Sequence, residues 1–441
     1  MPTSRPPRTS WLASDRPVPR LLARPIRTFL DTEASGGVVL LLATLAALVW
    51  ANSPWSSSYD TFWHTEIALE AGSRDLTLDL RHWVNDGLMT LFFFVVGLEI
   101  KRELVVGELN DARKAMLPAI AALGGMAGPA LLYLAFNAGE PGGPGWGIPM
   151  ATDIAFAVGV LAVLGSRIPS GLKVFLLSLA IVDDIGAIVV IALFYAGGLE
   201  PGWLLAAVAL LAFVVCLRRV RVHWVPVYAL LGAAVWFTTF QSGVHATIAG
   251  VALGLLAPAR PADPRGFADV LATARSLSDE PDAGSLRSVM LEGREVVPVA
   301  ERLGHLLHPY TSFIIVPLFA LANAGVALSS DGVAKAVTSR VGLGVIVGLV
   351  AGKILGITGA AWLASRSGLG RLPSGVAWPH VVGASAVAGI GFTVSLFITA
   401  LAFETDALVA QAKVGILLAS VAAGVLGALV LWRAPAADER V

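Results

Sequence analysis

The chain has 441 residues, of which 56% are hydrophobic and 14% are charged, and its mean hydropathy is +0.76. Soluble domains carry about 45–50% apolar and about 25% charged residues, so this composition excludes an ordinary soluble protein and predicts an all-α polytopic membrane protein. The formal net charge is zero, which gives no electrostatic basis for binding nucleic acid, and a single cysteine, Cys216, rules out an internal disulfide.

Apolar runs of about 20 residues predict about twelve membrane-spanning helices in one membrane domain, residues 31–433. Residues 1–30, rich in Arg and Pro, are expected to form a disordered cytoplasmic tail. A signal peptide ending near residue 51 is the alternative, but its basic region would be too long. The spans lie near 34–51, 84–103, 115–137, 147–164, 172–196, 202–217, 223–240, 243–258, 307–328, 341–363, 380–402 and 409–433.

The distribution of Lys and Arg supports this count. With the N-terminus in the cytoplasm, 25 of the 31 basic residues fall in cytoplasmic segments, 5 fall outside and one lies within a span. Cytoplasmic loops of membrane proteins carry such an excess, so both termini are expected inside the cell.

Two connecting segments stand out. Residues 259–304 form a long polar loop, expected in the cytoplasm. Residues 66–80, expected outside, alternate polar with apolar residues around Ala71–Gly72–Ser73–Arg74, which predicts a β-hairpin. An isolated hairpin is marginal in water and its edges invite pairing, so a homodimer contact is expected there. An irregular loop is the alternative.

Four charged residues lie within the predicted spans: Asp153, Asp183, Asp184 and Lys353. A charge at the bilayer centre costs at least about 2.5–3.5 kcal/mol and usually marks an ion path. A purely structural ion pair is the alternative, but one Lys cannot neutralise three carboxylates.

The adjacent carboxylates of Asp183 and Asp184 point about 100° apart on a helix. One can therefore face a cavity while the other faces a neighbouring helix. Such a pair titrates as a coupled unit and can exchange protons for a small hard cation that prefers oxygen ligands. We interpret the two aspartates as a proton–cation exchange site.

Spans 4 and 11 are expected to be broken. Pro149 interrupts "GWGIPMATDIAFAVGV", and three glycines interrupt "VVGASAVAGIGFTVSLF". Each is the middle span of a triplet, spans 3–5 and 10–12, and the two triplets run in opposite directions. Broken helices at matching positions of inverted repeats indicate a transporter's ion site. If the breaks cross, two half-helix N-termini meet, and an acid near them would stabilise their partial positive charges. A base would do the same for the partial negative charges of the paired C-termini. Asp153 and Lys353 are suitable candidates for these two positions.

At these residues the chain resembles the bacterial NhaA-type sodium/proton antiporter family. The matching stretches are "GWGIPMATDIAFAVGVLAVLGSRIP", "FLLSLAIVDDIGAIVVIALFY", "SGVHATIAGV", "PLFALANAGV", "GKILGI" and "GIGFTVSLFI". The resemblance implies that Asp184 and Asp183 bind the transported sodium and protons. It places Thr152 and Asp153 at the break of span 4, and Lys353 paired with Asp183 when sodium is absent.

The same resemblance implies an electrogenic exporter of sodium or lithium in the bacterial inner membrane, driven by protons, activated by rising cytoplasmic pH and without a cofactor. The transport core would lie within 115–196 and 341–433, and a dimerising interface domain within 31–103 and 202–328. The implied pH-response residues are Glu99, Arg102, Glu103, His305 and His308. For Glu99, Arg102 and Glu103, the alternative interpretation is that they lie at the membrane surface and extend their charged ends to water. Gly304 stands where the family pattern has an acid, which leaves the pH of activation open.

Two other functions compete. An intramembrane aspartyl protease would also need paired acids, but its Gly-x-Gly-Asp motif does not occur. A symporter on the same scaffold would move protons in the same direction as sodium.

Overall fold

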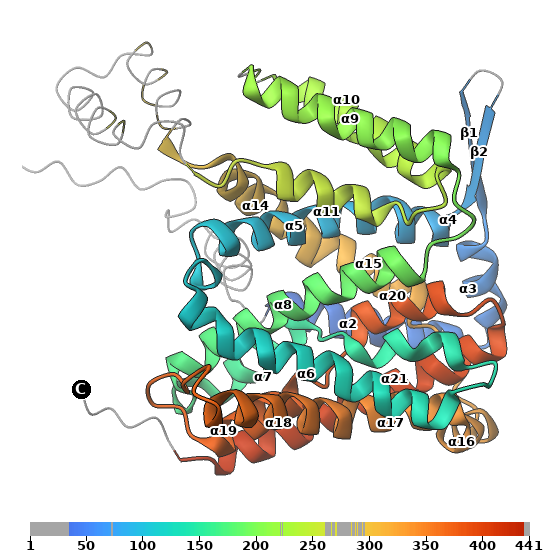
Figure 1. Ribbon diagram of the computed structural model, residues 1–441. Coiled ribbons are helices and arrows are strands. Elements are labelled where there is room, and N and C mark those ends of the chain that lie inside the picture. Colours follow the sequence, from blue (N-terminus) through green and yellow to red (C-terminus); the bar gives the residue numbers. More distant parts are fainter. Residues whose placement is uncertain are drawn as a thin grey trace, which may run out of the picture.

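Long helices lying side by side make up most of the chain in this computed structural model (Figure 1). It describes residues 35–71, 74–220, 222, 224–260 and 296–435, with isolated positions between 266 and 293. The predicted tail, 1–30, lies outside the described residues. In chain order the helices are α2 (Ser35–Ala51), α3 (Ser56–Trp63), α4 (Leu80–His82), η3 (Trp83–Leu88), α5 (Met89–Val105), η4 (Glu108–Asn110), α6 (Ala112–Asn137), η5 (Gly143–Met150), α7 (Ile154–Leu164), η6 (Gly165–Arg167), α8 (Ser170–Phe194), α9 (Pro201–Arg219), α10 (Val225–Gln241), α11 (Thr247–Leu256), α14 (Val299–Tyr310), η7 (Thr311–Ile315), α15 (Val316–Asn323), α16 (Ser330–Thr338), α17 (Arg340–Val347), η8 (Gly348–Gly352), α18 (Lys353–Arg366), α19 (Trp378–Val387), α20 (Phe392–Ala402) and α21 (Asp406–Arg433).

The helices have the length and composition of membrane spans. Among the described residues, seven helices are long and apolar enough to cross a membrane, and the number is nine if each of two sharply bent pairs is one span. The other three predicted spans coincide with α5, α10 and α11, of 17, 17 and 10 residues. A 17-residue helix is about 26 Å long, slightly less than the hydrocarbon core. The chain is a multi-pass all-α membrane protein, and twelve spans remains a prediction.

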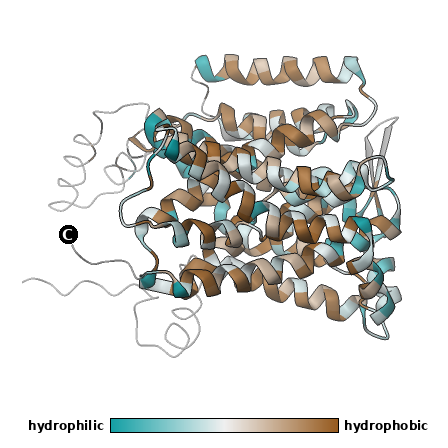
Figure 2. Ribbon diagram, turned by 60° about the horizontal axis from the view of Figure 1, so that its bottom comes forward, coloured by the Kyte–Doolittle hydropathy of each residue, from teal (hydrophilic) through white to brown (hydrophobic). Residues whose placement is uncertain are grey.

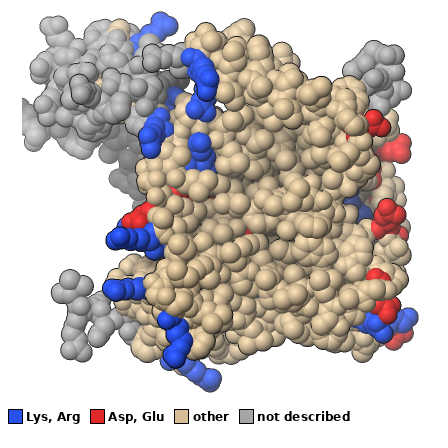
Figure 3. Space-filling model, viewed as in Figure 1, with Lys and Arg blue, Asp and Glu red and all other residues tan. Residues whose placement is uncertain are grey.

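Apolar and charged residues are separated along the helix axes. Figure 2 shows apolar residues along the middle of the helices and hydrophilic residues gathered at their ends. On the face drawn in Figure 3, Lys and Arg lie at one end and most Asp and Glu at the other, with an uncharged surface between. This is the pattern of a protein that crosses a bilayer.

Glycines allow the helices that carry the site to pack closely. A Cβ added to Gly124 of α6 would lie 2.3 Å from the Gly356 carbonyl oxygen of α18, and one added to Gly250 of α11 would lie 2.2 Å from the Thr90 carbonyl oxygen of α5. Small residues let helix backbones approach where no hydrophobic effect drives association. The contact between α6 and α18 holds the start of α18, at Lys353, against the neighbouring helix.

The predicted hairpin is confirmed. Strands β1 (Glu66–Ala71) and β2 (Arg74–Asp79) pair antiparallel, with Glu66 opposite Asp79 and Ala71 opposite Arg74. It projects from one end of the helices (Figure 1).

One boundary and two short helices differ from the sequence prediction. The loop predicted over 259–304 is wrong at its end, because α14 already begins at Val299, where Pro298 precedes the first helical residue. Most of that loop lies outside the described residues. The short helices α3 and α16 were not predicted, since neither is apolar enough to stand out as a span. Helix α3 follows α2 at a bend of 115°.

Candidate functional site

Two broken helices cross at the centre of the protein. The first consists of η5 and α7, separated by residues 151–153, and the second of α19 and α20, separated by residues 388–391 and bent by 47°. The Thr152 hydroxyl donates a hydrogen bond to the Ala388 carbonyl at 2.9 Å, and the Asp153 amide donates one to the Ile390 carbonyl at 2.6 Å. One amide of the first break and two carbonyls of the second are thus paired across the crossing, and such pairing within the protein is the condition for irregular backbone in a membrane.

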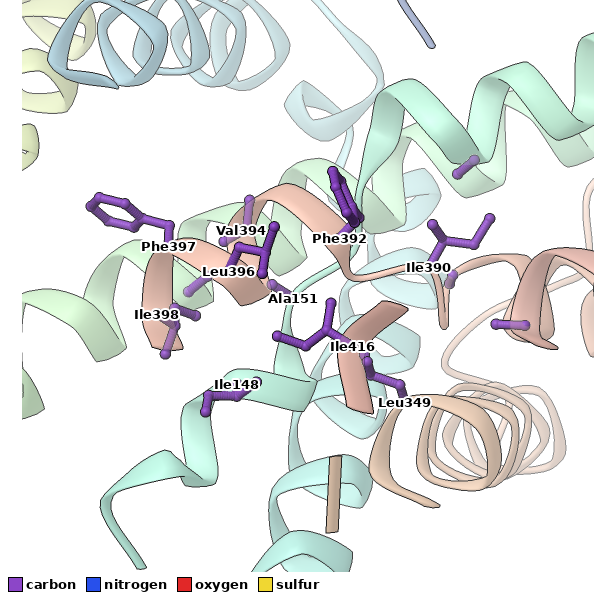
Figure 4. Close-up of a cluster of buried hydrophobic side chains, with 14 of the residues drawn as sticks. Ile148, Ala151, Leu349, Ile390, Phe392, Val394, Leu396, Phe397, Ile398 and Ile416 are labelled. Carbon is purple, nitrogen blue, oxygen red and sulfur yellow. The ribbon is translucent and has the colours of Figure 1, made fainter. Parts of the chain in front are cut away.

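The crossing is closely packed on the side away from the polar groups. Figure 4 shows apolar side chains from both broken helices around it, including Ile148, Ala151, Ile390 and Phe392. A Cβ added at Gly389 would lie 2.4 Å from the Leu349 carbonyl oxygen, so only glycine fits. The close approach of the Leu349 backbone therefore explains why position 389 is a glycine.

Asp153 lies at the break of the first broken helix, next to the N-termini of the two second halves, α7 and α20. Its Oδ1 accepts a hydrogen bond from the Phe156 amide of α7 at 3.2 Å, and its Oδ2 accepts one from the Thr393 amide of α20 at 3.0 Å. The carboxylate therefore caps the N-termini of two helices, whose partial positive charges stabilise an anion. The structure confirms the prediction of an acid at the paired N-termini.

Lys353 is completely buried and has three oxygen partners. Its Nζ donates to the Met150 carbonyl at the end of η5, to Thr152 Oγ1 at 3.0 Å and to Asp183 Oδ2 at 2.8 Å. The side chains of Lys353 and Asp183 are 0% and 1% exposed. The implied ion pair is present, and the ammonium also neutralises a helix C-terminal carbonyl.

Asp183 and Asp184 point to different surroundings. Asp183 faces Lys353, and its second oxygen, Oδ1, has no hydrogen-bond partner in the described part of the chain. Asp184 lines a cavity of about 150 Å³ together with Thr152, Asp153 and Thr393. This division is the one predicted for adjacent residues that point about 100° apart on a helix.

The cavity has the chemistry of a small-cation site. A water molecule takes about 30 Å³ of liquid volume, so a few waters or a hydrated ion fit. Asp153, Asp184 and Glu99 contribute carboxylates to its lining, with hydroxyls from Thr152, Thr311, Ser312 and Thr393. Of the described residues that line it, His308 alone is basic. Oxygen ligands and unbalanced negative charge favour a hard cation.

The five residues implied in the pH response divide into two groups. Glu99 of α5 and His308 of α14 both line the cavity, and His308 is exposed. Arg102 and Glu103 form an ion pair at 3.6 Å near the end of α5, where Glu103 also accepts from the Glu108 amide. His305 lies one turn before His308 and is not part of the cavity lining.

Two features of α20 were not predicted from the sequence, one in the cavity lining and one in the surrounding hydrophobic core. Thr393 follows the glycines of "GIGFTVSLFI" and is the first hydroxyl of the second half-helix, a signal that was available. Phe397, one turn beyond Thr393 and Val394, packs its ring 5.5 Å from Phe93 and 6.2 Å from Phe319. No local signal reveals this contact, because the three rings come from α20, α5 and α15.

Comparison with known proteins identifies the family of the chain. The family model described as Na+/H+ antiporter 1 matches residues 27–431. The chain is 48% identical to Na(+)/H(+) antiporter NhaA 3 of Frankia alni, over 95% of this chain and 92% of that protein. It is also 48% identical to Na(+)/H(+) antiporter NhaA of Anaeromyxobacter sp., over 99% and 96%, and 47% identical to the protein of that name in Rhodopirellula baltica, over 95% and 96%. These relatives lend no support to the symporter or the protease considered above.

Proposed function

Because this chain belongs to the Na+/H+ antiporter 1 family, it is a membrane transporter and not an enzyme, and we propose that the cavity beside Asp184 is where sodium and protons exchange. The observation that carries the proposal is the placement of Asp184 and Asp153 on one small cavity, with the Asp183–Lys353 ion pair buried beside them.

Asp184 is the primary ligand of the proposed mechanism. A sodium ion in the cavity takes oxygen ligands from Asp184, and the Thr152 hydroxyl and Asp153 lie on the same cavity wall. Protons compete for the same carboxylate oxygens, so sodium binds as protons leave and is released when protons return. Lithium, a smaller hard cation, uses the same ligands.

Asp183 is the second carboxylate. When sodium enters, Asp183 leaves Lys353 and offers an oxygen to the ion. Within the described ranges its Oδ1 accepts no hydrogen bond, so this oxygen is available to the ion. Two carboxylates, or one carboxylate and Lys353, carry two protons for each sodium ion, which makes the exchange electrogenic.

Activation by rising cytoplasmic pH is assigned to the side of the cavity where Glu99 and His308 lie. His308 is the one basic residue among the described residues that line the cavity, and histidine is the side chain that changes charge near neutral pH. Arg102, Glu103 and His305 belong to the same end of α5 and α14 and complete the proposed pH-response group.

The proposed placement in the bacterial inner membrane has twelve spans and both termini in the cytoplasm. The separation of Lys and Arg from Asp and Glu in Figure 3 supports this orientation. Helices α6–α8 and α17–α21 form the proposed transport core, with inverted repeats. The other spans form the interface, where the β1–β2 hairpin pairs with a second copy to make a homodimer.

Vesicle transport tests the carboxylate mechanism. Sodium added to inverted vesicles that hold the wild-type protein should drive protons out of the lumen, whereas a symporter would move protons with sodium. Asp184→Asn should abolish the exchange, and Asp183→Asn should abolish or severely reduce it, because an amide cannot exchange a proton for a cation. Asp331→Asn, the same change at an exposed position of α16, is the control and should transport normally. Wild-type rates in Asp184→Asn would refute the mechanism.

A further inference from the structure

Among the described residues, the donors that hold the Asp153 carboxylate lie at the starts of two half-helices, and one of those donors is a side chain. Besides the Phe156 and Thr393 amides, Oδ2 accepts a hydrogen bond from the Thr393 hydroxyl at 2.7 Å. That hydroxyl belongs to the second residue of α20, on the opposite side of the crossing from Asp153.

We propose that Thr393 is a positioning residue for sodium binding: its hydroxyl fixes the orientation in which Asp153 presents its charge to the cavity beside Asp184. This inference rests on the proposed function and adds a residue on the second broken helix to the cation site.

Burial makes the hydroxyl bond significant. Asp153 and Thr393 are 3% and 4% exposed, and both line the cavity. A hydrogen bond to a charged group is shorter and about twice as strong as one between neutral groups. With the hydroxyl, Oδ2 accepts two hydrogen bonds from Thr393. Without it, each carboxylate oxygen keeps one amide donor, Phe156 for Oδ1 and Thr393 for Oδ2, and the shortest of the three bonds that set the orientation of the group is lost.

The rest of the crossing does not depend on this hydroxyl. The Thr152–Ala388 and Asp153–Ile390 hydrogen bonds join the same two breaks, and the Ser395 hydroxyl donates to the Ile148 carbonyl at 2.7 Å. Loss of the Thr393 hydroxyl should therefore leave the helices crossed while releasing the orientation of Asp153. A preorganised ligand binds more tightly than one that must be ordered on binding, so the effect should fall on the sodium KM.

Thr393→Val tests the proposal, since valine keeps the branched shape and the backbone amide but removes the hydroxyl. The expected result is a sodium KM raised by about five- to tenfold, with kcat changed less than about twofold. This is less than the effect of losing a hydrogen bond to a charged group outright, which exceeds about tenfold, because both carboxylate oxygens keep their amide donors. Thr393→Ser, which keeps the donor, should have a KM close to the wild type. The readout is sodium-dependent ΔpH in vesicles at saturating proton gradient.

Thr399→Val is the matched control. Thr399 also lies on α20 and is 0% exposed, but its hydroxyl donates only to the Ser395 carbonyl of its own helix, at 2.8 Å. An unchanged KM in this control, together with a raised KM in Thr393→Val, assigns the effect to the bond with Asp153.

Three results would overturn the proposal: a wild-type KM in Thr393→Val, an equal rise in Thr399→Val, or a Thr393→Ser variant as impaired as Thr393→Val. Should the valine variant not be recovered folded, Thr393→Cys, whose thiol is a weaker donor, replaces it with the same expectation and the same refutation. Exchange by the wild type in the same assay separates the two proposals, because its absence would contradict the proposed function and not the role of Thr393.

Discussion

Replacement of Lys353 by Ala should destabilise the protein far more than replacement of an exposed partner of an ion pair. The ammonium–carboxylate pair is 2.8 Å long and its two side chains are 0% and 1% exposed. Removing one partner of a buried pair leaves the other charge without water or counter-charge, which costs about 3–5 kcal/mol. Here the change also removes the donor to the Met150 carbonyl and to the Thr152 hydroxyl.

Arg340→Ala is the control for this experiment. Arg340 pairs with Glu140, but the two side chains are 64% and 42% exposed, so the loss should be at most about 1 kcal/mol. The double variant Lys353→Ala with Asp183→Asn removes the stranded charge and should recover part of the lost stability, as a double-mutant cycle would measure. The assay is the free energy of unfolding in detergent micelles, from a denaturant titration. A value for Lys353→Ala within about 1 kcal/mol of the wild type would show that the pair does not stabilise the folded protein.

Two further changes test other parts of the site. Gly389→Ala should reduce the amount of folded protein recovered and abolish exchange, because the new Cβ would meet the Leu349 carbonyl oxygen at 2.4 Å. Gly359→Ala, in α18 with nothing within 4 Å, should instead be neutral or stabilise by about 0.5–1 kcal/mol, and equal behaviour of the two would contradict the close crossing. Gly304→Glu should move the pH midpoint of activation to a more alkaline value with little change in maximal rate. The space around Gly304 is open, and an added carboxylate beside the exposed His305 favours its protonated form, so a higher pH is needed to deprotonate it. A charge at 4 Å in water is worth about 1 kcal/mol, which limits the shift to about 0.7 pH unit. Superimposable pH profiles of sodium-induced ΔpH would mean that position 304 does not set the response.

Much of the architecture could be predicted from the sequence because the bilayer restricts a chain to a few solutions. Each predicted apolar run coincides with a helix, and the breaks near Pro149 and between Gly389 and Gly391 are where the helices unwind. Charged residues deep in apolar runs marked Asp153, Asp183, Asp184 and Lys353, since such residues are too costly to be placed there without a role.

The prediction of membrane spans from hydropathy is limited because hydropathy reports only whether a segment is apolar. Hydropathy shows where a chain can be buried in lipid, but it does not distinguish a helix that crosses from one that is too short, such as α11 with its 10 residues. Helix α3 bends back at 115° beside α2, and its composition, with Ser56, Asp60 and Trp63, carries no membrane signal.

Only the tertiary structure decided which side chains contact one another. The sequence by itself determined that acids and a lysine lie in the membrane and that two helices break. Helix geometry did not determine which of the two aspartates faces the cavity, since either was compatible with 3.6 residues per turn, and the pairing of Lys353 with Asp183 was implied only by the family resemblance. The sequence also did not show that Thr393, 240 positions from Asp153, completes the cap of that carboxylate. Hydropathy and propensity are local properties of the chain, whereas hydrogen bonds between two broken helices depend on how the helices cross, and the crossing is set by the packing of all the elements around it.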